Sequence, residues 1–118
     1  MGISICVFCA SSNHARADYL EVARRLGELM AASHRSSRDL YEVSLPELDI
    51  LAEAAQSADG CVGARLSGAG FGGCVVALCE ADAVMEVGKR VDLAFSQKFG
   101  RSPELFHCRL AEAAGVLP

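Results

Sequence analysis

The sequence contains no apolar run that approaches the roughly 18 residues a helix needs to cross a membrane. Its first residues, Met1 to Ser4, lack the basic region of a secretory signal peptide. Positive charge is also scarce, because 11 Lys and Arg face 15 Asp and Glu, for a formal net charge of −4. That balance argues against nucleic acid or an anionic membrane as the partner. We therefore expect a cytoplasmic protein with neither of these partners.

Metal-ligand spacing is missing as well, although six cysteines are many for 118 residues. Only Cys6 and Cys9 form a C-x-x-C, and a zinc site needs a second close pair or a histidine pair. His14, His34 and His107 offer no such pair. A redox C-x-x-C usually opens a helix, whereas this one falls in an expected strand that turns its residues to opposite faces. We expect no metal site, and thiols that act as small buried apolar side chains.

The remaining composition is that of one globular domain. Apolar residues make up 52% and charged residues 22%, and a single domain accommodates residues 1–118. The sequence shows no repeat, linker or low-complexity segment. Apolar runs, helical periodicity and turn residues predict these elements in order: a strand at 3–9, a helix at 16–33, a short helical stretch at 36–41, a helix at 46–57, strands at 61–66 and 74–79, a helix from 82 that Gly100 closes, and a strand at 104–109.

This order predicts an α+β fold, a ferredoxin-like split βαβ sandwich with one extra helix (β-α-α-β-β-α-β). Strands one and three are central in that topology. The corresponding runs, Ile5–Cys9 and Cys74–Cys79, are the most uniformly apolar in the chain. Two helix starts are also predicted: Ser44 and Glu47 have capping-box spacing, and Asp82 is a candidate N-cap.

The segment Gly63–Cys74 holds five glycines among twelve residues and joins two of the expected strands. Glycine takes positive φ without steric cost, and successive backbone N–H groups can form a concave anion site. A tight hairpin without a ligand has the same spacing, so both interpretations stay open. The candidate residues for binding a ligand or anion are Arg65, Ser67, Gly68, Gly70, Gly72 and Gly73.

The same segment resembles the third conserved motif of galactokinases, which belong to the GHMP small-molecule kinases. The stretches His34–Ser44, Pro46–Asp49 and Glu104–Arg109 are also similar to that family, so the likeness covers about residues 26–118. Residues 34–118 are thus galactokinase C-terminal-like, and 1–33 form an opening strand and helix of mixed resemblance. The resemblance implies helices on an antiparallel sheet.

Two departures from the family pattern are visible. Ser67 stands where threonine is usual and keeps the hydroxyl, whereas Leu40 stands where aspartate is usual and removes a charge.

The galactokinase resemblance is incomplete. The N-terminal sugar-binding motif and the serine-rich phosphate loop of that family are absent from the sequence. Phosphoryl transfer depends on positioning and charge stabilisation, which one glycine loop cannot supply. We therefore assign no catalytic residue and expect no catalysis by the chain alone. ATP and magnesium are implied only by the resemblance, in which the loop lies beside the phosphate loop and sugar. The expected partners are a missing N-terminal kinase domain or a second copy, and a small anionic ligand.

The N-terminus resembles a different family. Ile3–Ser12, with Tyr19 and Ala23, is similar to the opening of the Lonely-Guy-type phosphoribohydrolases, whose Pro-Gly-Gly-x-Gly-Thr signature is absent here. This resemblance gives an alternative function, a phosphate- or nucleotide-binding fragment, and suggests a natural or engineered fusion. The secondary phosphate-site candidates follow the first strand and equally fit an ordinary helix N-cap; they are Ser11, Ser12 and Asn13.

Overall fold

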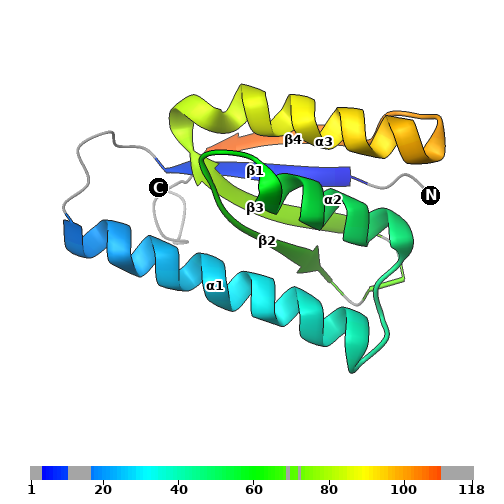
Figure 1. Cartoon of the computed structure of the whole chain (residues 1–118), viewed down its shortest axis with the longest axis horizontal. Helices are drawn as coiled ribbons and strands as arrows, with labels where there is room; N and C mark the ends of the chain where they lie inside the picture. The colour runs from blue at the N-terminus through cyan, green and yellow to red at the C-terminus, as the bar shows by residue number, and fades with distance from the viewer. Residues whose placement is uncertain (1–3, 11–16, 69, 72, 110–118) are drawn as a thin grey trace, which may run out of the picture.

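The structure of the chain is a computed structural model that describes residues 4–10, 17–68, 70, 71 and 73–109. Four strands form one sheet with three helices beside it (Figure 1). In chain order the elements are β1 (Ser4–Ala10), α1 (Ala17–Asp39), α2 (Pro46–Ser57), β2 (Cys61–Ser67), β3 (Cys74–Glu80), the 3-10 turn η1 (Ala81–Ala83), α3 (Val84–Phe99) and β4 (Glu104–Arg109).

The strand order is β2-β3-β1-β4, so the two most apolar runs are central, as predicted. The α+β class is confirmed. The direction of β1 differs from that in a split βαβ sandwich: β1 is parallel to both β3 and β4, and only β2 and β3 are antiparallel. The extra helix accounts for this difference. A single helix between two strands returns the chain to give parallel strands, whereas α1 and α2 together run the length of the sheet twice, in opposite directions, and leave β2 antiparallel to β1.

The core lies between one face of the sheet and the pair α2 and α3, which cross that face in Figure 1. Alternation in β3 buries Val75, Ala77 and Cys79 toward these helices. Each fully buried Leu, Val or Phe contributes about 1.5–3 kcal/mol to folding. Strand β2 adds Ala64 and Leu66 to this core. The helices face the strands with residues at spacings of three and four: Leu48, Leu51 and Ala55 from α2 and Val84, Val87, Val91 and Phe95 from α3.

Helix α1 lies along the outer edge of β2 and is one continuous helix, so the predicted stretch at 36–41 forms its last turn and the residues that follow. The approach is close enough to require glycine on both elements. A Cβ at Gly27 would lie 1.8 Å from the carbonyl oxygen of Val62, and a Cβ at Gly63 would lie 2.6 Å from Cα of Gly27. No helix in the described ranges is both long and apolar enough to cross a membrane.

Both predicted helix caps are wrong. Leu45 occupies the N-cap of α2 without a side-chain hydrogen bond, and the Ser44 hydroxyl donates instead to the Asp49 carboxylate at 2.7 Å. Asp82 lies inside η1, so Ala83 precedes α3. The end of α3 agrees with prediction, because Gly100 has φ 69° and donates its N–H to the last turn.

Candidate functional site

Residues 68–73 of the glycine-rich segment connect β2 to β3, whose ends meet where Ser67 pairs with Cys74. Gly68, Gly70 and Gly73 have φ of 93°, 92° and 95°, which only glycine adopts readily. Phe71 between them also has positive φ, at 59°. The predicted need for glycine is therefore confirmed at three positions, and Gly72 lies outside the described residues.

One side of this loop is seated on the segment between α1 and α2. The Phe71 N–H donates to the carbonyl oxygen of Val43 at 2.6 Å, and a Cβ at Gly70 would lie only 2.2 Å from that oxygen. Gly68, by contrast, has no heavy atom within 4 Å of its Cβ position, and Ser67 is exposed. The loop is therefore anchored at Gly70 and Phe71 and open to solvent at Gly68.

The structure brings four candidate residues together in this loop: Ser67, Gly68, Gly70 and Gly73. Arg65 lies two residues earlier on β2, half-buried, and its Nε donates to the carbonyl oxygen of Leu66 at 2.8 Å. Its guanidinium is thus held at the strand that leads into the loop. Anion binding by these residues stays a prediction. Residues 11–13, the secondary candidates, lie outside the described residues.

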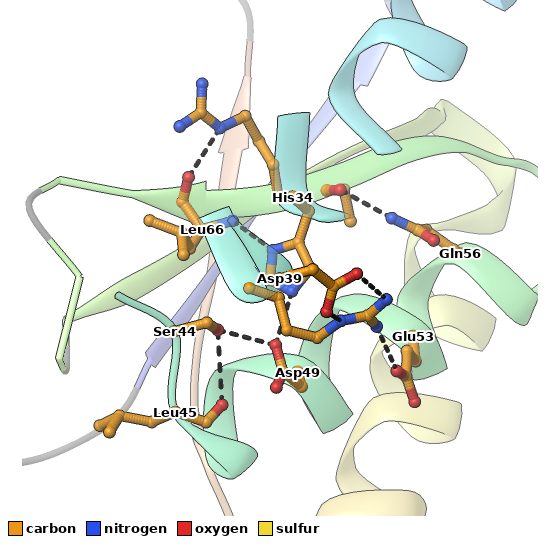
Figure 2. A network of polar contacts seen from close by, with 11 residues as sticks. His34, Asp39, Ser44, Leu45, Asp49, Glu53, Gln56 and Leu66 are labelled. Carbon is orange, nitrogen blue, oxygen red and sulfur yellow. Dashed lines mark hydrogen bonds and ion pairs between the residues drawn. The ribbon is translucent and has the colours of Figure 1, made fainter. Parts of the chain in front are cut away.

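The buried His34 of α1 forms hydrogen bonds with the end of β2, just before the loop, and with α2 (Figure 2). The N–H of Leu66 donates to Nδ1 of His34 at 3.1 Å, and Nε2 of His34 lies 2.9 Å from the Asp49 carboxylate. Because Nδ1 accepts, the ring proton lies on Nε2 and is donated to Asp49. The Ser44 hydroxyl donates to the same carboxylate oxygen. This network joins α1, α2 and β2 immediately before Ser67.

Sequence reasoning missed the role of His34. One signal was available, because His34 lies seven residues after Gly27 and so on the same face of α1, and both are buried. A second helix side chain completes the edge of β2: Gln56 Nε2 donates to the carbonyl oxygen of Ala64 at 2.8 Å. His34 and Gln56 thus supply hydrogen-bond partners to two backbone groups of β2, the Leu66 N–H and the Ala64 carbonyl.

Charged residues beside this network form ion pairs, with Arg38 at their centre. The Arg38 guanidinium donates to both Asp39 oxygens, at 2.8 and 3.0 Å, and to Glu53 of α2 at 3.2 Å. The hydrogen bond from Arg38 lowers the pKa of the Asp39 carboxyl below its usual value. These pairs are on the surface, so they link α1 to α2 without forming a site.

Cys61 at the start of β2 gives a prediction about reactivity. Burial raises the pKa of its thiol to about 11, from an ordinary value of 9.0. The nucleophilic thiolate is therefore scarce: at pH 8 it makes up about one part in a thousand of the Cys61 side chain. We expect slow iodoacetamide labelling of Cys61 that accelerates about tenfold per pH unit between pH 8 and 10. Peptide mass spectrometry measures this, with free cysteine as the reference; labelling of Cys61 at the reference rate at pH 8 would contradict it.

The described residues contain no group of three His, Cys, Asp or Glu side chains placed to hold a metal ion.

Comparison with known proteins identifies relatives of this fold. The family described as "GHMP kinases C terminal" matches residues 17–96. Galactokinase from Roseiflexus sp. (strain RS-1) is 45% identical over 75% of the chain and 23% of that relative. Human galactokinase is 43% identical over 86% of the chain and 24% of its own length. The canine enzyme is 48% identical over 92% of the chain and 26% of its length. The chain thus spans about a quarter of these relatives.

A solved structure gives the same result. The crystal structure of Lactococcus lactis galactokinase complexed with galactose matches with a TM-score of 0.68 and 44% identity, over 73% of the chain and 22% of that protein. In sequence and in fold, the chain therefore matches about a quarter of the length of a galactokinase.

Proposed function

The chain belongs to the GHMP kinase C-terminal family, and on that premise we propose that it supplies the C-terminal part of a galactokinase-type site and transfers no phosphoryl group by itself. The observation that carries this proposal is the β2–β3 loop. Three glycines with positive φ shape it, the Phe71–Val43 hydrogen bond anchors one side, and the other side is open to solvent. A loop fixed in this way supports a ligand that other residues bind and activate.

The division of roles follows from the chemistry of phosphoryl transfer. That reaction needs groups that cradle the phosphates, hold magnesium and orient the accepting hydroxyl. We assign these groups to the three quarters of a galactokinase that the chain does not span. The chain's own residues position the loop: Gly70 permits the close approach to Val43, and His34 fixes the strand before Ser67. ATP is the phosphoryl donor that the relationship implies.

The phosphoribohydrolase alternative receives no support from the comparisons. Of the residues that carry that resemblance, Ser11 and Ser12 lie outside the described residues, as does the site candidate Asn13, whereas Tyr19 and Ala23 fall within the GHMP kinase match, which covers residues 17–96. We infer a cytoplasmic location, supported by a sequence with a net charge of −4 and no long apolar run.

A graft tests the proposal. In human galactokinase the segment that corresponds to residues 17–109 is replaced by those residues of this chain, and ATP-dependent phosphorylation of galactose is assayed. We expect the graft to retain turnover within about tenfold of the human enzyme, a barrier change near 1.4 kcal/mol. The matched variant carries Gly70→Val in the same graft, which we expect to lose most of that activity because the side chain collides with Val43.

The isolated chain is the second arm. With ATP, magnesium and galactose we expect no turnover, because the phosphate-binding and base groups are missing. Turnover by the isolated chain would overturn the proposal that it needs a partner domain. A folded graft without activity would overturn the proposal that this loop serves a galactokinase-type site. A graft that does not fold would count against it equally.

A further inference from the structure

The sides of helix α1 have different surroundings. Gly27 and His34, seven residues apart and both buried, mark the face that packs on β2. On one side of that face the helix carries charges at spacings of three and four, because Arg24 forms ion pairs with Glu21 and Glu28. The charges on this side of α1 are thus paired within the helix itself.

The other side of α1 is apolar and exposed. Val22, Leu26 and Leu29 follow one another at spacings of four and three, so they share one side of the helix, and they are 65%, 46% and 57% exposed. Leu40 extends this row, because it lies about three turns beyond Leu29 and its N–H continues the helical hydrogen bonding to the Ser36 carbonyl. It is 80% exposed. These four apolar residues form the apolar flank of α1, and such a flank marks an interaction surface.

The apolar flank leads toward the glycine loop. Its last member, Leu40, is three residues before Val43, so the two Cα atoms are within about 11 Å of each other. Val43 accepts the Phe71 N–H and so anchors the loop. Helix α1 also lies at the border of the molecule in Figure 1, with the flank's whole length open to a partner. A body that covers the flank therefore comes within reach of the loop.

We propose that the apolar flank of α1 is the surface on which the remaining three quarters of a galactokinase dock. This inference rests on the proposed function, in which that body supplies the groups that act beside the loop. The family match covers all of α1, so the flank belongs to the part that the chain shares with galactokinases. In those relatives the shared part is about a quarter of one longer polypeptide. Docking along the flank brings the larger part to the open side of the loop.

The area of the flank disfavours a second copy of the chain as its occupant. From Val22 to Leu40 the flank is about 27 Å long and about 10 Å wide, the dimensions of one side of a helix. Two copies packed flank to flank would bury about 540 Å² in total, whereas stable interfaces bury about 1,200–2,000 Å². The larger part of a galactokinase is not restricted to the flank, because it also meets the loop.

Thermal unfolding of the galactokinase graft, compared with that of the full chain alone, tests the proposal. Leu29→Lys places a charge on the flank, and lysine has nearly the helix propensity of leucine. In the full chain, where Leu29 is largely in water, we expect the midpoint to change by less than about 2 °C. In the graft we expect the midpoint to fall by about 5 °C or more, because the docked body buries the charge. Val22→Lys should reproduce both results.

The matched control is Leu93→Lys on α3, a residue that is 60% exposed and lies across the molecule from α1 in Figure 1. It should change the midpoint by less than about 2 °C in the graft and in the full chain. A graft that Leu29→Lys leaves unchanged would overturn the proposal. So would an equal loss in the full chain, an equal loss from Leu93→Lys, or a graft that does not fold. A full chain that sedimentation equilibrium shows to dimerise, and that Leu29→Lys returns to a monomer, would assign the flank to a second copy instead.

The docking proposal and the proposed function can fail separately, because docking is measured by stability and function by turnover. A folded, inactive graft that Leu29→Lys destabilises would overturn the proposed function and support docking on the flank. An active graft whose stability is unaffected by Leu29→Lys would do the reverse.

Discussion

Replacing Gly27 with alanine is expected to destabilise the domain by about 3 kcal/mol or more, the upper range for inserting a methyl group into a packed interface. The new Cβ would lie 1.8 Å from the Val62 carbonyl oxygen, which is backbone and cannot rotate away. Helix α1 would have to separate from β2 and would pull His34 from Leu66. Thermal unfolding followed by circular dichroism should show a midpoint lowered by about 12 °C or more.

Gly88 provides a matched control for Gly27. It also lies inside a helix, but the nearest heavy atom to its Cβ position is Leu105 Cδ1 at 3.9 Å, an ordinary contact distance. Gly88→Ala should therefore stabilise the domain by about 0.5–1 kcal/mol through helix propensity alone. If the two variants shifted the midpoint in the same direction and by similar amounts, the close packing of α1 on β2 would be incorrect.

The sequence was sufficient to predict those features of the fold that depend on neighbouring residues. Alternation and apolar runs placed β3 and β4, and glycine composition identified the loop residues whose φ is positive. The central places of β1 and β3 followed from the split βαβ topology, with which their uniformly apolar runs agree. The direction of β1 did not follow, because it depends on how many helices run the length of the sheet between β1 and β2.

The missed features depend on residues distant in sequence. His34 is 32 positions from Leu66, and no periodic pattern reports that its ring reaches a strand edge. Ser44 has the spacing of a capping box, but Leu45 occupies the N-cap of α2 and the Ser44 hydroxyl donates to Asp49, whose carboxylate oxygen also lies 2.9 Å from His34 Nε2. The local rule thus failed where a tertiary hydrogen-bond network holds the side chain.

The second large effect is expected from His34→Leu. Leucine fills a similar volume, so the loss isolates the two hydrogen bonds: the Leu66 N–H becomes a buried donor without an acceptor, and Asp49 loses a donor. An unsatisfied buried group costs about 1–3 kcal/mol, and the loss of the hydrogen bond to the Asp49 carboxylate adds to this cost. We therefore expect the free energy of unfolding to fall by about 2–4 kcal/mol. Urea unfolding measures the free energy of unfolding directly.

Gln56→Leu is the graded comparison, because it removes only the bond to the Ala64 carbonyl oxygen from a half-buried side chain. We expect about 1 kcal/mol for that single neutral hydrogen bond. Amide hydrogen exchange separates the two variants further: His34→Leu should deprotect Leu66 and the loop that follows it, whereas Gln56→Leu should leave them protected. Equal losses of stability, with Leu66 still protected in His34→Leu, would show that the histidine fills space without holding the strand. Selective deprotection would instead establish that the imidazole of His34, whose Nδ1 accepts the Leu66 N–H, sets the position from which the glycine loop begins.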